Sequence, residues 1–218
     1  MSDRELILSR IREAQAKARS EGAHPPAYVQ DRTFSQVLPQ VGADVASRRA
    51  CFARHCEKLR TRLIEVPDAA SAEAAVASLA AEHNWQRVAV HDGVAAVPAS
   101  LSTLNVSGGY DRWELEKCDA GITSCVCLVA QTGSIVVTSA HTGGRALSVL
   151  PPHHLVITTI DKLVEDMPKA YEVLQAELVA RPSSFASFIT GPSRTGDIER
   201  ILVLGAHGPK QLTVILIG

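Results

Sequence analysis

Short apolar runs alternate with helical segments along most of this chain. Runs rich in Val, Ile and Leu predict strands at residues 87–91, 126–130, 135–138, 155–160, 201–204 and 212–217. Helical patterns predict helices at residues 43–62, 68–83 and 168–180. Near-continuous apolar strands that alternate with helices are typical of an open, mostly parallel sheet with helices on both faces. We therefore expect an α/β domain over residues 43–218.

Residues 1–42 have a different pattern. An amphipathic helix is predicted over residues 2–20 by apolar residues at helical spacing among Arg and Glu, namely Leu6, Ile7, Ile11, Ala14 and Ala18. Ser2 and Glu5 form a capping-box pattern at the start of this helix. Gly and Pro residues then interrupt the periodicity, and we expect an extended arm up to residue 42. The apolar stripe of the helix is expected to pack on its own domain or on a partner subunit.

Composition and charge narrow the class of protein. The chain has 218 residues, with 22 Lys and Arg against 23 Asp and Glu, a formal net charge of −1. A hydrophobic content of 46% excludes a disordered chain. Near-neutral charge argues against a nucleic-acid partner, which requires a basic excess to neutralise phosphates. The longest apolar runs are about ten residues, short of a membrane span. Five cysteines, an odd number without framework spacing, indicate a reduced cytoplasmic setting.

The five cysteines do not form a metal-binding pattern. Cys51 and Cys56, with His55 between them, lie on a predicted helix and are weak candidates for a metal site. Cys125 and Cys127 are two apart at the edge of a predicted strand, so we expect them to share a face as buried, small apolar side chains. No run of closely spaced cysteines suits an iron–sulfur cluster. We therefore expect neither a metal nor a cofactor in this chain.

The histidines also fail to form a metal site. His153 and His154 are adjacent, and adjacent side chains on extended backbone point to opposite faces. His207 lies in a Gly-rich loop before the last predicted strand. There it can act as a hydrogen-bond donor or proton carrier, or serve only a structural role.

Four loops beside predicted strands combine Gly, Ser and Thr with single charges. They span residues 130–134, 141–145, 191–197 and 205–210. Glycines let backbone N–H groups approach an anion, and Arg145, Arg194 and Lys210 can supply positive charge. Ligands of open α/β sheets bind outside the carboxyl ends of strands, where we expect these loops to gather. Neither a P-loop nor a dinucleotide-binding fingerprint is present.

These loops give a candidate site for an anionic small molecule. Its residues are Gln131, Thr132, Gly133, Arg145, Gly191, Ser193, Arg194, Thr195, Asp197, His207 and Gly208. Two simpler interpretations stay open at this point. Each loop can be only a turn, and Asp197 can be the acidic partner that neutralises Arg194.

Five sequence blocks carry a resemblance to a known family. They are Gly121-Ile-Thr-Ser-Cys125, Ala130-Gln-Thr-Gly-Ser134, Arg145-Ala-Leu-Ser-Val-Leu-Pro151, Gly191-Pro-Ser-Arg-Thr-Gly-Asp-Ile-Glu199 and Gly205-Ala-His-Gly-Pro209. In this order they resemble the LUD family, and within it the lactate-utilisation proteins. The resemblance covers residues 65–218 well, and the N-terminal arm is in keeping with it.

The resemblance implies a fold and a function. The implied fold is related to the NagB/RpiA/CoA-transferase-like α/β fold and to 5-formyltetrahydrofolate cyclo-ligase. The implied function is that of a subunit in an L-lactate utilisation system, which oxidises L-lactate to pyruvate together with iron–sulfur partner subunits. The clusters would then lie on those partners. The resemblance establishes no catalytic residue in this chain.

Gln131 departs from the family pattern, which usually has Glu in this turn. In CoA transferases of the related fold, a Glu in a similar turn forms a covalent thioester. A neutral amide is neither a carboxylate nucleophile nor a base at neutral pH, so we do not expect acyl-CoA transfer by that mechanism.

Three functions are therefore compatible with the sequence. The first is a subunit of a lactate-oxidising system. The second is a stand-alone enzyme or binding protein for a phosphate-, nucleotide-, CoA- or folate-like anionic metabolite. The third is an assembly subunit without a site of its own.

Overall fold

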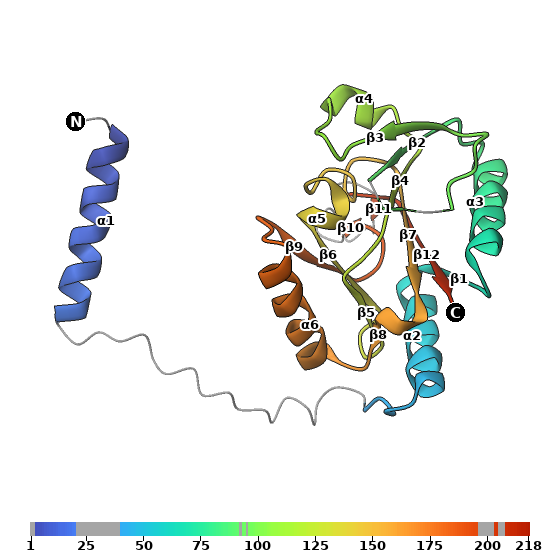
Figure 1. Cartoon of the computed structure of the whole chain (residues 1–218), viewed down its shortest axis with the longest axis horizontal. Helices are drawn as coiled ribbons and strands as arrows, with labels where there is room; N and C mark the ends of the chain where they lie inside the picture. The colour runs from blue at the N-terminus through green and yellow to red at the C-terminus, as the bar shows by residue number, and fades with distance from the viewer. Residues whose placement is uncertain (1–2, 21–39, 92, 95, 196–202, 205–207) are drawn as a thin grey trace. The chain divides into compact units, whose positions relative to one another are not determined.

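The computed structural model describes residues 3–20, 40–91, 93–94, 96–195, 203–204 and 208–218 (Figure 1). By its internal contacts the chain divides into two units, Met1–Leu38 and Pro39–Gly218. The described part of the first unit is the helix α1 (Asp3–Ser20). Four of its large apolar side chains are exposed, namely Leu6, Ile7, Leu8 and Ile11. Ser2 and most of the predicted arm lie outside the described residues.

The second unit is built on a six-stranded parallel sheet. Its strands are β1 (Arg62–Val66), β2 (Arg87–Val90), β3 (Ser102–Asn105), β4 (Ala120–Thr123), β7 (His153–Thr159) and β12 (Gln211–Ile217). They are ordered β1-β12-β7-β4-β2-β3, and every neighbouring pair is parallel. The central strands β7 and β12 are buried along most of their length. This arrangement confirms the expected α/β class with a mostly parallel sheet.

Alternate residues of the central strands belong to two different apolar cores. Leu155 and Ile215 pack with Leu79 of α3 (Ala69–His83) on one face. Their neighbours Val156 and Val214 pack with Phe52 of α2 (Val45–Leu59) on the other. Because side chains of a strand alternate between its faces, the uninterrupted apolar runs reflect burial on both sides.

Both of these helices have well-defined ends. The side chains of Asp44 and Asp68 accept hydrogen bonds from backbone N–H groups in the first turns of α2 and α3. Left-handed residues end the two helices, Arg60 with φ 62° and Asn84 with φ 55°. The predicted helix over residues 43–62 therefore extends too far, because Arg62 already begins β1.

A second sheet was not expected from the sequence. It contains β8 (Leu163–Val164), β5 (Cys127–Val129), β6 (Ser134–Thr138) and β9 (Ala186–Ile189), in that order. β5 and β6 are antiparallel. The short turn between them permits this pairing, whereas parallel strands need a crossover of about a dozen residues or more. The predicted strands at residues 126–130 and 135–138 exist, but they do not belong to the parallel sheet.

The small sheet also separates two cores. Leu128 and Ile135 face the core of α2, whereas Val129 and Val136 face the helix α6 (Met167–Ala180). Shorter elements complete the unit, namely α4 (Arg112–Glu116), α5 (Ser139–Thr142), a 3₁₀ turn (Ile160–Lys162), β10 (Arg194–Thr195) and β11 (Val203–Leu204). The strand expected over residues 201–204 is described only as β11, which pairs with β10 rather than with the large sheet.

Gly121 should be essential for the packing of β4. A Cβ atom at this position would overlap the backbone carbonyl oxygen of Leu147. We predict that Gly121→Ala lowers the free energy of unfolding by about 1–3 kcal/mol, because buried backbone cannot easily move away. Urea unfolding followed by circular dichroism measures the loss. Gly108→Ala is the matched control, since no heavy atom lies within 4 Å of its added Cβ. Equal stability of the two variants would contradict the prediction.

Candidate functional site

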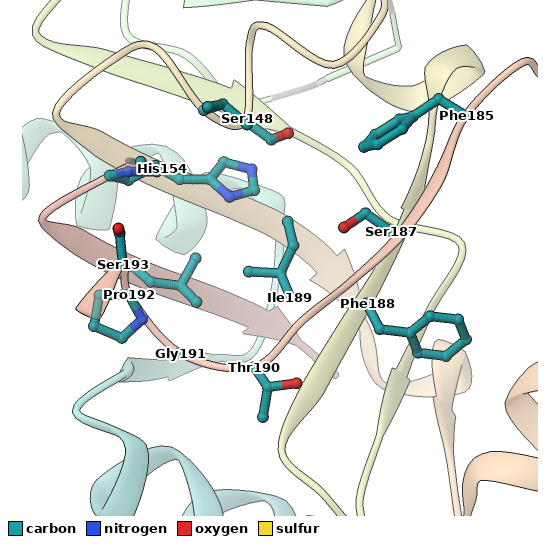
Figure 2. Close-up of a pocket in the computed structure, with 14 residues that line it drawn as sticks. Ser148, His154, Phe185, Ser187, Phe188, Ile189, Thr190, Gly191, Pro192 and Ser193 are labelled. Carbon is teal, nitrogen blue, oxygen red and sulfur yellow. The ribbon is translucent and has the colours of Figure 1, made fainter. Parts of the chain in front are cut away.

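A pocket of about 260 Å³ opens where three separate segments of the second unit meet. Its lining comes from residues 148–149 with His154, from residues 185 and 187–193, and from residues 208–209 with Leu212 (Figure 2). The first segment precedes β7 and includes the second residue of that strand. The second segment contains most of β9 and the loop that follows it. The third precedes β12 and includes the second residue of that strand. The pocket thus depends on the tertiary fold and not on any one motif.

The pocket lies at the amino edge of the large sheet. His154 is the second residue of β7, and Leu212 is the second residue of β12. The sequence-based expectation of a site at the carboxyl ends of the strands is therefore wrong for this pocket. The loop of residues 208–210 directly precedes β12, so it lies at the beginning of that strand and not at its carboxyl end.

His154 is the most constrained polar group in the pocket. It is 1% exposed, and its ring points into the pocket between Ser148 and Ile189 (Figure 2). Its Nε2 atom lies 2.9 Å from Oγ1 of Thr123. Its Nδ1 atom has no hydrogen-bond partner among the described residues. A buried polar atom is almost always paired, so the unpaired Nδ1 atom of His154 is an exception.

The His154 ring is neutral at physiological pH. Burial lowers its pKa from 6.5 to about 3, and the neighbouring His153 contributes to the same shift. Which ring nitrogen carries the proton follows from the hydrogen bond with Thr123. If Thr123 donates to Nε2, Nδ1 carries the proton and is a donor toward the pocket. If Nε2 donates, Nδ1 is an acceptor for a ligand hydroxyl.

Hydroxyl groups supply the other polar contacts of the lining. Ser148 donates to the carbonyl oxygen of Arg145 at 3.2 Å. Ser187 and Ser193 also line the pocket, and the Ser187 hydroxyl points toward its centre (Figure 2). Thr190 lies 2.7 Å from Ser134 through their hydroxyl oxygens. The described lining contains no charged side chain, and apolar groups such as Phe185, Ile189 and Leu212 fill the rest.

Positive charge lies beside the pocket instead of inside it. The Arg145 guanidinium is 5.2 Å from the centre of the Phe185 ring, which lines the pocket. Nη2 of Arg194 would lie 3.0 Å from a Cβ atom added to Gly191, another lining residue. The structure therefore places both predicted arginines next to the same pocket.

Three of the predicted loop residues line the pocket directly. Gly191 has φ 95°, and an added Cβ would lie 3.1 Å from the carbonyl oxygen of Leu59 at the end of α2. The Ser193 N–H donates to the carbonyl oxygen of Pro209 at 2.9 Å. Gly208 packs against the Ser193 side chain, since a Cβ atom added to Gly208 would lie 3.2 Å from Cβ of Ser193. Close backbone approach thus holds the two loops together.

The turn around Gln131 does not line the pocket. Gln131 is 7% exposed, and its Oε1 accepts from the N–H of Met167 at 3.5 Å, at the start of α6. Gly133, with φ 68°, packs against His55 of α2. Thr132 is linked to the pocket through a chain of hydroxyl groups, since it lies 2.7 Å from Ser134, which contacts Thr190.

Some expectations for the site concern residues without a description. Asp197, His207 and the side chain of Thr195 lie outside the described residues. Sequence reasoning also missed residues that the structure brings to the pocket, above all His154 and Ser148. One signal was available for His154, namely a histidine at the start of a strongly apolar strand. Such a ring must be buried, and a buried ring needs partners for both nitrogens.

All five cysteines are buried thiols. Burial raises the pKa of Cys125 to about 11 and that of Cys127 to about 12, so neither is a thiolate at neutral pH. The two do not share a face, since Cys125 packs in the core of α2 and Cys127 in that of α6. A bend at Val126 breaks the alternation between them. Within the described residues, no group of three His, Cys, Asp or Glu could hold a metal ion.

A comparison with models of protein families shows the family to which this chain belongs. The model of the LUD domain family matches residues 50–217. The chain belongs to the LUD domain family. The resemblance seen in the sequence blocks is thereby confirmed, and the LUD domain contains the whole pocket.

Curated relatives are similar over different lengths of the chain. Lactate utilization protein C of Deinococcus radiodurans is 32% identical over 138 residues, which are 62% of this chain and 64% of that protein. An uncharacterized protein of Neisseria meningitidis is 30% identical over 64% of this chain and 58% of its own length. Lactate utilization protein C of Bacillus subtilis is 27% identical over 100% of this chain and 97% of that protein.

A solved structure supports the fold. The crystal structure of a DUF162 family protein from Deinococcus radiodurans aligns with a TM-score of 0.68 and 24% sequence identity. The alignment covers 81% of this chain and all of that one.

In the part of the chain that the structure describes, no helix combines the length and apolar character needed to cross a membrane.

The neutral state of His154 predicts a pH-dependent stability. An unfolded His154 takes up a proton near pH 6.5, whereas the folded ring stays neutral down to about pH 3. Acidification from pH 7 to pH 5 therefore favours the unfolded chain, by about 1–2 kcal/mol for this ring. We predict that His154→Gln loses less stability than the wild type over this range. Urea unfolding at pH 7 and pH 5 compares them, and an identical pH dependence would show that the ring is not buried as described.

Proposed function

We propose that this LUD domain chain acts in lactate utilisation, as a subunit of a system that oxidises L-lactate to pyruvate. In this proposal it binds a small anionic metabolite in the pocket at His154. The observation that carries the proposal is a fully buried histidine that lines a hydroxyl-bearing pocket and whose Nδ1 atom has no hydrogen-bond partner among the described residues. Support for the process comes from relatives named lactate utilization protein C.

The groups around the pocket suit a 2-hydroxy acid. The neutral His154 ring offers a hydrogen bond to the ligand hydroxyl, and the Ser148 and Ser187 hydroxyls can bind further oxygen atoms. Phe185 and Ile189 provide an apolar surface for a methyl group. Arg145 and Arg194 beside the pocket compensate the charge of a carboxylate.

The proposal divides the reaction between subunits. Oxidation of a 2-hydroxy acid to a 2-oxo acid removes two electrons and two protons. The two electrons pass to the iron–sulfur partner subunits and the two protons are released to solvent, while this chain binds and orients the substrate or product. Copurification from the native host, with mass spectrometry of proteins and bound small molecules, tests for those partners.

A second candidate function follows from the size of the pocket. At about 260 Å³ it approaches the size of ordinary ligand pockets, about 300–1,000 Å³, which is ample for a three-carbon acid. A stand-alone enzyme or binding protein for a larger anionic metabolite would also use this space. Thermal-shift measurements with lactate, pyruvate, CoA, nucleotides and folates separate the two functions. A large shift with a nucleotide or folate and no partner association favours the second.

Blocking the pocket should abolish the function. Val149 lines the pocket and is 39% exposed, so a larger side chain can enter the pocket without displacing the core. We predict that Val149→Trp fails to restore growth on L-lactate in a host whose own gene is disrupted. Val179→Trp is the matched control, because Val179 is 80% exposed on α6 and should complement fully. Complementation by both variants would count against a role for the pocket.

The arginines should matter for an anionic ligand. Arg194 is exposed next to Gly191, and we predict that Arg194→Gln weakens binding of the ligand about tenfold, or about 1.4 kcal/mol. Calorimetric titration with the best ligand from the thermal-shift screen measures the change. Arg112→Gln removes an equal charge from an exposed ion pair with Glu116 and serves as the control. If the two variants bind equally well, Arg194 has no part in the site.

A further inference from the structure

A second cavity lies beside the first, on the other face of the large sheet. It measures about 220 Å³ and shares Pro192 and Leu212 with the first pocket. Its walls come from the end of α2, the start of β1, the end of α3, and the residues that enter β12. His153 lines it, whereas His154 lines the first pocket, because neighbouring side chains of β7 point to opposite faces.

This cavity, unlike the first, is lined by charged side chains. Arg60, Arg62 and Lys210 contribute three positive charges, and Glu82 contributes one negative charge. Glu82 is already engaged, since both of its carboxylate oxygens accept from Nη1 of Arg62, at 2.7 and 2.8 Å. Among the described residues, neither Arg60 nor Lys210 has an ion-pair partner. Counted over Arg60, Arg62, Lys210 and Glu82, the lining carries a formal net charge of +2.

Hydrogen bonds fix the backbone at the two residues that carry the unpaired cations. Arg60 is the left-handed residue that ends α2, and its N–H donates to the carbonyl oxygens of Cys56 and Glu57. The Lys210 N–H donates to the carbonyl oxygen of Pro152 at 2.8 Å. The carboxyl end of the α2 dipole stabilises a cation at Arg60. No helix end accounts for Lys210, which precedes β12.

One buried residue of the lining, His153, is uncharged at neutral pH. His153 is 3% exposed, and its Nε2 lies 2.8 Å from Oγ1 of Thr213. Its ring meets Trp85 edge-on, with 4.9 Å between the ring centres. Burial, together with the neighbouring His83 and Arg62, lowers the pKa of His153 to about 4. His153 therefore adds no charge at neutral pH to that of the charged side chains in the lining.

We propose that this cavity binds a dianionic group of the phosphate class, held by Arg60 and Lys210. A phosphate monoester carries about −1.5 to −2 charges at neutral pH, which matches the two unpaired cations. A monocarboxylate would leave one of them uncompensated. The site is separate from the pocket at His154 and does not depend on the function proposed for that pocket.

Calorimetric titration of the purified full chain with inorganic phosphate tests the site. We expect the double variant Arg60→Asn/Lys210→Gln to bind phosphate at least tenfold more weakly than the wild type. Asn is chosen at residue 60 because it tolerates left-handed backbone. Lys210→Gln alone, at an exposed position, should lose part of the affinity and does not disturb the end of α2.

A charge-matched control and a second ligand complete the experiment. Lys169→Gln removes one positive charge from an exposed pair with Glu172 and should bind phosphate like the wild type. Glycerol phosphate titrated in parallel distinguishes an ester from free phosphate as the ligand, since the tighter binder identifies the source. Undetectable binding by the wild type, or equal binding by the wild type and the double variant, overturns the proposal. Because no lactate is involved, neither result bears on the proposed function.

Discussion

The parallel pairing of β7 with β12 is the constraint on which both cavities depend. It places His153 opposite Gln211 and His154 opposite Leu212 at the amino ends of the two central strands. A shift of one residue in this register would exchange the faces of every side chain along β12. The apolar residues that follow prevent such a shift, because alternate residues of both strands fill two separate cores. The packing of the middle of the sheet thus determines the chemistry at its edge.

The two adjacent histidines begin β7 as uncharged groups, and burial is the common cause. Each ring satisfies one nitrogen with a threonine of a neighbouring strand, Thr213 for His153 and Thr123 for His154. An unpaired buried polar atom costs about 1–3 kcal/mol. The Nδ1 atoms of both rings have no hydrogen-bond partner among the described residues, and each therefore lowers the stability of the domain unless another group or a water molecule pairs with it.

The strands that sequence reasoning found are those with continuous Val, Ile and Leu, and in the two larger sheets these are the interior strands β2, β5, β6, β7 and β12. It missed the interior strand β4, which includes Gly121, and the edge strands β1, β3, β8 and β9. It also could not separate two sheets, since the direction of pairing between β5 and β6 depends on a turn and not on apolarity. The Gly-rich loops of the sequence correctly indicated three residues that line the pocket, namely Gly191, Ser193 and Gly208. His154 was missed because it was considered only as a metal ligand.

The separation between neutral pocket and flanking cations has a physical reason. A guanidinium enclosed in an apolar lining would lose its hydration before any ligand arrived, at a cost of several kcal/mol. Arg145 avoids this cost by lying over the Phe185 ring while it remains exposed. In the proposed function, an entering anion brings the opposite charge and is itself desolvated only against hydroxyls and a neutral imidazole. Lining groups of this kind select by hydrogen-bond geometry, whereas the arginines attract any anion alike. Selectivity should therefore depend on His154 and the serines, and rate of entry on the arginines.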